Sequence, residues 1–164
     1  MQDLIPLAEK IGDALKTRHE TIGVAESSSG GLISSALLAI PGASAYYQGG
    51  AVVYTLQSRR ALLDLPDSAF TGLRGLTEDL ALVLARAALQ RFATTWSISE
   101  IGAAGPTGSR YGDPPGTSCI AVAGPVERAL LIHTGNADRV TNMREFAAQA
   151  LQLLSECLAS CRKD

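Results

Sequence analysis

The chain has 164 residues, 46% hydrophobic and 18% charged, a composition typical of one globular domain (1–164) that excludes a disordered chain. Its 14 basic and 16 acidic residues give a net charge of −2, which argues against a nucleic-acid partner. No stretch is long and apolar enough to span a bilayer, no signal peptide is recognisable, and the three cysteines are odd in number. We therefore expect a cytoplasmic protein with reduced thiols and no membrane partner.

The first half of the chain is predicted to alternate helices and strands. The apolar spacing predicts a helix at 2–18, a strand at 21–25, a helix at 32–40, a turn at 41–44, a strand at 46–54 and a short helix at 58–63. Within the second strand, Gly49 and Gly50 indicate a bulge or a close backbone approach. Residues 64–76 have no regular pattern.

The second half continues with a helix that Thr77 is placed to cap, because threonine is a favoured N-cap and acids follow it. The prediction is a helix at 77–92, strands at 97–103, 117–123 and 129–134, a Gly- and Pro-rich loop at 105–116, and a helix at 137–160. The tight Gly124-Pro125 turn makes the last two strands antiparallel neighbours.

This order predicts an α/β fold, a three-layer α/β/α sandwich with a mixed, mostly parallel sheet of about five strands. In such sheets ligands bind beyond the C-terminal ends of the parallel strands. The serine cluster at 27–29 and the loop at 105–116 both follow strands, so we expect both at that edge.

The segment 25–31, Ala-Glu-Ser-Ser-Ser-Gly-Gly, joins a strand to a helix. Its small residues let backbone N–H groups approach an anion, and a serine at such a turn can act as a nucleophile. An ordinary helix cap favours the same residues and is the commoner explanation. The segment is not a Walker-type phosphate loop, because it has no lysine.

Basic residues follow the second strand at Arg59 and Arg60, where they could hold a phosphate or form a solvated surface pair. Arg139 and Arg144 near the last helix offer the same two alternatives. The length of the 105–116 loop favours a ligand contact over a plain surface loop. We expect no metal, since Cys157 and Cys161 have no histidine partners at ligand spacing. We also expect no cofactor.

Five segments in this order resemble the CinA C-terminal-domain family. They are Ala-Glu-Ser-x-Ser-Gly-Gly at 25–31, Pro-Gly-Ala-Ser-x-Tyr at 41–46, Gly-Gly-x-Val-x-Tyr-Thr at 49–55, Gly-x-Ala-Gly-Pro at 102–106 and Pro-x-Gly-Thr at 114–117. The resemblance covers nearly the whole chain and implies the stand-alone, homo-oligomeric form of the domain. It also implies a nicotinamide mononucleotide amidohydrolase, which converts the carboxamide to an acid and ammonia.

The resemblance assigns the catalytic roles to Ser27, Tyr54 and Arg59. It implies a substrate-binding set of Glu26, Ser29, Gly30, Gly31, Gly50, Arg60, Gly102, Ala104, Gly105, Pro106 and Arg144, of which Arg144 is matched only loosely. In the amidohydrolase hypothesis the N–H groups near Gly30 and Gly31 hold the oxyanion.

Two departures support an alternative hypothesis. Family members usually carry a lysine where this chain has Arg59, and a threonine where it has Ile101. Lysine can serve as a base when burial lowers its pKa, whereas arginine keeps its proton. The alternative is a catalytically impaired relative that binds a nucleotide as an accessory or regulatory protein.

Overall fold

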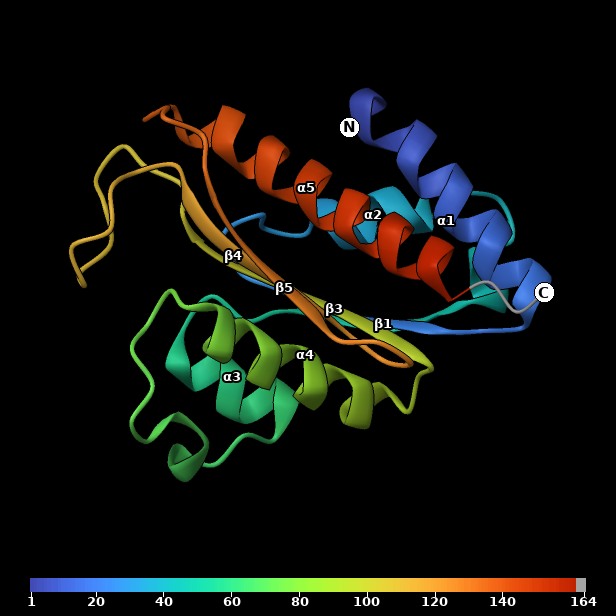
Figure 1. Ribbon diagram of the computed structural model, residues 1–164, viewed down its shortest axis with the longest axis horizontal. Helices are drawn as coiled ribbons and strands as arrows, with labels where there is room; N and C mark the ends of the chain where they lie inside the picture. Colours follow the sequence, from blue (N-terminus) through green and yellow to red (C-terminus); the bar gives the residue numbers. More distant parts are fainter. Residues whose placement is uncertain (162–164) are drawn as a thin grey trace.

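A five-stranded mixed sheet forms the centre of the computed structural model, which describes residues 1–161 (Figure 1). Its strands are β1 (Ile22–Glu26), β2 (Tyr47–Val52), β3 (Trp96–Ala103), β4 (Thr117–Ala123) and β5 (Arg128–His133). The strand order is β2-β1-β3-β4-β5. β1 pairs in parallel with β2 and β3, whereas β4 runs antiparallel to β3 and β5. The predicted mixed, mostly parallel sheet is confirmed.

Helices cover both faces of this sheet, which confirms the three-layer sandwich (Figure 1). α1 (Ile5–Arg18), α2 (Leu32–Leu38) and α5 (Arg139–Ser160) lie on one face, and α3 (Leu56–Leu63) and α4 (Glu78–Phe92) lie on the other. Three short 3₁₀ helices occupy Gln2–Leu4, Ala43–Ala45 and Asp67–Phe70. The last of these lies in the segment predicted to be irregular.

Burial along the strands follows their position in the sheet. Every residue of β1 and β4 is buried, while the edge strands β2 and β5 keep exposed positions along their length. This is expected, because a central strand is covered by helices on both sides. The sheet therefore separates two apolar cores, one containing Trp96 and Leu151 and the other containing Leu84 and Ile101.

Local sequence signals account for several boundaries. Thr77 caps α4 by accepting a hydrogen bond from the Leu80 N–H at 3.3 Å, as predicted. α3 begins earlier than expected, at Leu56, because Thr55 and Ser58 form a reciprocal capping box. In the second strand, both the predicted bulge and the predicted close approach to the backbone are found at Gly49.

The register of β1 against β2 shifts at that point, since Ile22 pairs with Tyr47 and Gly23 with Gly49. A Cβ on Gly49 would lie 2.7 Å from Cδ1 of Phe92 at the end of α4, so the Phe92 ring leaves room only for a glycine at this position.

Cys119 and Cys157 are fully buried, and Cys161 is half-buried. Within residues 1–161, no three His, Cys, Asp or Glu side chains lie close enough to hold a metal ion. In the same part of the chain, no helix combines the length and the apolar character needed to cross a bilayer.

Candidate active site

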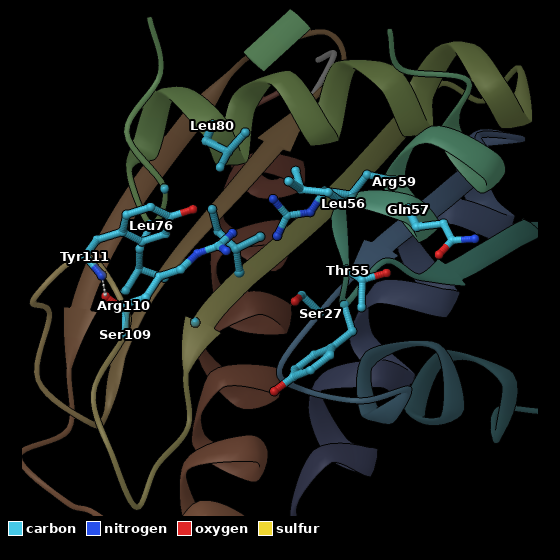
Figure 2. Close-up of a pocket in the computed structure, with 14 residues that line it drawn as sticks. Ser27, Thr55, Leu56, Gln57, Arg59, Leu76, Leu80, Ser109, Arg110 and Tyr111 are labelled. Carbon is cyan, nitrogen blue, oxygen red and sulfur yellow. Dashed lines mark hydrogen bonds between the residues drawn. The ribbon is translucent and has the colours of Figure 1, made fainter. Parts of the chain in front are cut away.

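A cavity of about 590 Å³ opens at the C-terminal ends of β1 and β3 (Figure 2). Its lining comprises Ser27 after β1, Tyr54 to Gln57 and Arg59 around the start of α3, Gly75, Leu76 and Leu80 around the start of α4, Ile101 and Gly102 at the end of β3, and Ser109 to Tyr111 in the 105–116 loop. This is the edge predicted for ligand binding. No carboxylate belongs to the described lining, so its fixed charges are those of Arg59 and Arg110.

The Glu26 carboxylate is buried and caps the start of α2. It accepts hydrogen bonds from the N–H groups of Gly31 (2.9 Å), Ile33 (3.1 Å) and Ser34 (3.0 Å), and from the hydroxyls of Ser29 and Ser34. A helix N-terminus attracts negative charge, and here the protein supplies that charge itself. The expected anion site at the start of this helix is therefore occupied by Glu26, which has no exposed surface.

A second buried carboxylate, Glu100 on β3, accepts hydrogen bonds from the serine loop, residues 27–29. One oxygen accepts from the Ser27 N–H (3.1 Å) and the Ser29 N–H (2.8 Å), and it shares the single proton of the Ser29 hydroxyl, at 2.9 Å, with the Glu26 carboxylate. The other accepts from the hydroxyls of Ser28 and Ser118. Burial raises the pKa of the Glu100 carboxyl above its ordinary value, and the bonds from the serines oppose that rise only in part.

Sequence reasoning missed Glu100, although a signal was present. Glu100 alternates with Trp96 and Ile98 on one face of its strand, so it must be buried, and a buried carboxylate needs several donors. The serine cluster supplies those donors. The cluster is therefore a structural cap, as the commoner explanation held, and its first residue, Ser27, also lines the cavity.

The Ser27 hydroxyl differs from its neighbours because it takes no part in this network. Its N–H binds Glu100 and its carbonyl accepts from the Gly30 N–H at 3.1 Å, but no described residue hydrogen-bonds its Oγ. The side chain faces the cavity and is 5% exposed. The Gly30 and Gly31 N–H groups already donate within the loop, so the structure does not leave them free for an oxyanion.

Arg59 and Tyr54 line the cavity as expected. The Arg59 Nε donates to the Val53 carbonyl at 3.2 Å, and burial lowers the pKa of its guanidinium. An arginine nevertheless keeps its proton in the neutral range, so Arg59 is a fixed cation. The Tyr54 hydroxyl accepts from Arg139 at 3.3 Å, and Arg139 also donates to the Gly105 carbonyl at 2.9 Å.

Gly102 is the only member of the expected substrate-binding set in the described lining. Arg60 instead pairs with Asp67 at 2.5 Å, and Arg144 lies beside Met1 and Asp3 in a separate hollow. Ser29, Gly30 and Gly31 belong to the cap of α2, and Gly50 lies in β2 against Ser34. Ala104, Gly105 and Pro106 follow β3, where Ala104 and Gly105 accept side-chain hydrogen bonds from α5 and Pro106 is exposed.

An ion pair holds the 105–116 loop over the cavity. Arg74 donates to Asp113 at 2.7 Å and to the Tyr111 carbonyl at 3.0 Å, and the Ser109 hydroxyl donates to Asp113 at 2.5 Å. The Asp113 side chain is only 15% exposed. Burial tends to raise the pKa of Asp113, but the bonds from Ser109 and Arg74 together lower it.

We expect Asp113→Asn to loosen this loop without unfolding the chain. The lowered pKa means that the stabilisation by Asp113 is present above its unfolded pKa of about 3.9 and is lost as the pH falls through the folded value. At neutral pH the variant should exchange the Ser109 and Gly112 amide hydrogens about ten-fold faster. Asp67→Asn, which removes the exposed pair with Arg60, is the matched control. Unchanged protection in Asp113→Asn would show that the ion pair does not hold the loop.

Fold and site together define a three-layer α/β domain with a cationic cavity above a serine loop. The CinA C-terminal domain family matches residues 4–158, and the chain belongs to this family. A CinA-like protein of Salinibacter ruber is 34% identical over 148 residues, which are 90% of this chain and 36% of that protein. The chain thus spans about a third of the length of this curated relative.

Solved structures of similar proteins share the fold. The competence/damage-inducible protein of Agrobacterium tumefaciens is 28% identical, with a TM-score of 0.87 over 96% of each chain. The competence damage-inducible protein A of Klebsiella pneumoniae is 25% identical, with a TM-score of 0.89 over 97% of this chain and 99% of that one.

Proposed function

We propose that the chain binds nicotinamide mononucleotide in this cavity and hydrolyses its carboxamide with Ser27 as the nucleophile. The observation that carries the proposal is the hydroxyl of Ser27. Ser28 and Ser29 both donate their hydroxyls to Glu100, whereas Ser27 keeps its own free of the described network and turned to the cavity. A hydroxyl that is not needed by the fold is available to a substrate.

In the proposed reaction the Ser27 Oγ bonds to the carboxamide carbon and its proton goes to the leaving nitrogen. The C–N bond breaks, ammonia leaves, and an ester to Ser27 remains. Water then cleaves this ester, which gives nicotinic acid mononucleotide and restores the hydroxyl. Tyr54 shares the cavity with Ser27 and is positioned by Arg139, so we propose that its hydroxyl carries the proton.

A second candidate function is a nucleotide-binding relative without this activity. One observation favours it: the position that carries a base in the family is Arg59, a permanent cation tied to the Val53 carbonyl. A serine hydroxyl without a base is a weak nucleophile. The cavity and its charge would still hold a nucleotide.

Ammonia release from nicotinamide mononucleotide separates the two candidates. We expect slow release by the wild type and, in Arg59→Lys, a kcat about 10²-fold higher, because burial lowers the pKa of a lysine so that it can act as a base. Mass spectrometry of the acid product confirms the reaction. Binding of nicotinamide mononucleotide with no ammonia from either protein would reject the hydrolase and support the second candidate.

A further inference from the structure

Two buried glutamates meet at one hydroxyl of the serine loop. The Ser29 Oγ lies 2.9 Å from a carboxyl oxygen of Glu26 and 2.9 Å from one of Glu100. Both glutamates have no exposed surface, and within residues 1–161 neither forms an ion pair. Because a hydroxyl has one proton, Ser29 can donate to only one of the two carboxyl groups at a time. Two neighbouring negative charges repel, so this pair is stabilised when one member holds a proton.

The hydrogen bonds assign the negative charge to Glu26. Its carboxylate caps α2 and accepts from three N–H groups and the Ser34 hydroxyl, in addition to its share of Ser29. The N-terminus of a helix also stabilises a negative charge. Glu100 caps no helix and accepts from two N–H groups, those of Ser27 and Ser29. The proton of the pair therefore belongs on Glu100.

Ser118 gives a geometric reason for a proton on Glu100. Its Oγ lies 3.2 Å from Glu100 Oε1 and 3.0 Å from the Ile101 carbonyl oxygen, and both of these are acceptors when Glu100 is charged. The one proton of Ser118 can serve only one of them. When Oε1 carries a proton, Glu100 donates to Ser118 and Ser118 donates to the carbonyl, so both contacts are satisfied. Burial of the Glu100 carboxyl, which raises its pKa, acts in the same direction.

The other side chains around Glu100 come from different elements. β4 contributes Cys119, whose pKa is raised by burial to about 12, so the thiol stays neutral. α3 contributes Arg59, a permanent cation on the cavity side. α5 contributes the Phe146 ring, which reaches the same side of Gly102 as Glu100 and does not titrate. A change of pH in the range where carboxyl groups titrate therefore alters the two glutamates and not these neighbours.

We propose that Glu100 is a positioning residue for Ser27: it holds the Ser27 N–H while it carries a proton, and loss of that proton slows the attack on the amide. The proton is on Oε1, so Oε2 accepts from the Ser27 and Ser29 N–H groups in either state. Ionisation therefore leaves the loop in place and adds a negative charge beside it. Attack by Ser27 places a negative charge on the carbonyl oxygen of the substrate, which a second charge nearby opposes. The effect on rate rests on the proposed function, whereas the proton on Glu100 does not.

Nuclear magnetic resonance tests the proton without any substrate. In a pH titration of the full chain, we expect the Ser27 and Ser29 amide signals to shift together with a midpoint above about 4.3, the ordinary value for glutamate. Glu100→Gln should abolish this midpoint, because a side-chain amide does not titrate. Glu127→Gln, which replaces an exposed glutamate paired with Arg86, is the matched control and should leave it unchanged. A midpoint that persists in Glu100→Gln, or that lies at or below about 4.3 in the wild type, would overturn the proposal.

Ammonia release from nicotinamide mononucleotide, measured against pH, tests the effect on Ser27. In the wild type, kcat should fall about ten-fold as the pH rises through the midpoint of the amide signals. KM should stay within about two-fold, because the added charge opposes the transition state and not the bound substrate. Glu100→Gln should keep the low-pH kcat across this range, since it carries no charge.

The two proposals fail in different ways. Amide signals that titrate in the wild type and not in Glu100→Gln, with no ammonia from either protein, would keep the proton on Glu100 and reject the hydrolase. Ammonia release that is lost in Ser27→Ala, with the same pH dependence in the wild type and Glu100→Gln, would keep the hydrolase. That second result would overturn the positioning role of Glu100, because another group would then set the pH profile.

Discussion

Replacement of Ser27 by alanine should reduce ammonia release from nicotinamide mononucleotide at least about 10³-fold, because the nucleophile is lost. The fold should survive. The Ser27 backbone forms the hydrogen bonds to Glu100 and Gly30, and alanine retains both of these. Affinity for nicotinamide mononucleotide should stay within about two-fold, because the other side chains that line the cavity are untouched.

Ser35→Ala is the matched control for this experiment. Ser35 is an exposed serine on α2, and its loss should leave kcat unchanged. Steady-state ammonia assays at saturating substrate, with both variants checked by urea unfolding, give the comparison. Full turnover by Ser27→Ala would show that another group attacks the amide, and would reject the proposed nucleophile.

The second large effect concerns Glu100 and stability. Glu100→Ala should cost about 3 to 5 kcal/mol of unfolding free energy, because it leaves the N–H groups of Ser27 and Ser29 unpaired at about 1 to 3 kcal/mol each and opens a cavity. Glu100→Gln should cost less than about 1.5 kcal/mol. Its amide oxygen can accept from the two N–H groups, and its NH₂ can donate to the hydroxyls of Ser28 and Ser118, which can turn to accept.

Urea unfolding of the wild type and both variants measures this difference. Because burial raises the folded pKa of Glu100, its stabilising contribution is complete below the unfolded pKa of about 4.3 and is lost as the pH rises through the folded value. The stability of the wild type relative to Glu100→Gln should therefore fall as the pH is raised. A cost in Glu100→Gln equal to that in Glu100→Ala would show that the charge itself is required.

How much of the site could be predicted from the sequence depended on whether the interactions are local or long-range. Thr77 capped its helix as expected, because the cap is formed by residues three apart in the sequence. Ser27, Tyr54 and Arg59 reached the cavity, because each follows a strand whose C-terminal end is fixed by the sheet. Arg60 did not, although it is adjacent to Arg59 in sequence. Neighbouring residues on a helix point in different directions, and Asp67 lies within reach of Arg60.

The sequence by itself determined most of the secondary structure and the three-layer fold class, because apolar periodicity and small-residue turns are local properties of the chain. The family followed from the resemblance of five short motifs in order. The tertiary structure alone decided which charged groups meet. Glu100 lies more than seventy residues from the serine loop that it supports, and Arg110 lies some fifty residues from Arg59. Such meetings depend on the strand order and on how one loop folds over another. Neither is encoded in any single segment, so the buried carboxylate and the arginine pair emerge only when the chain is folded.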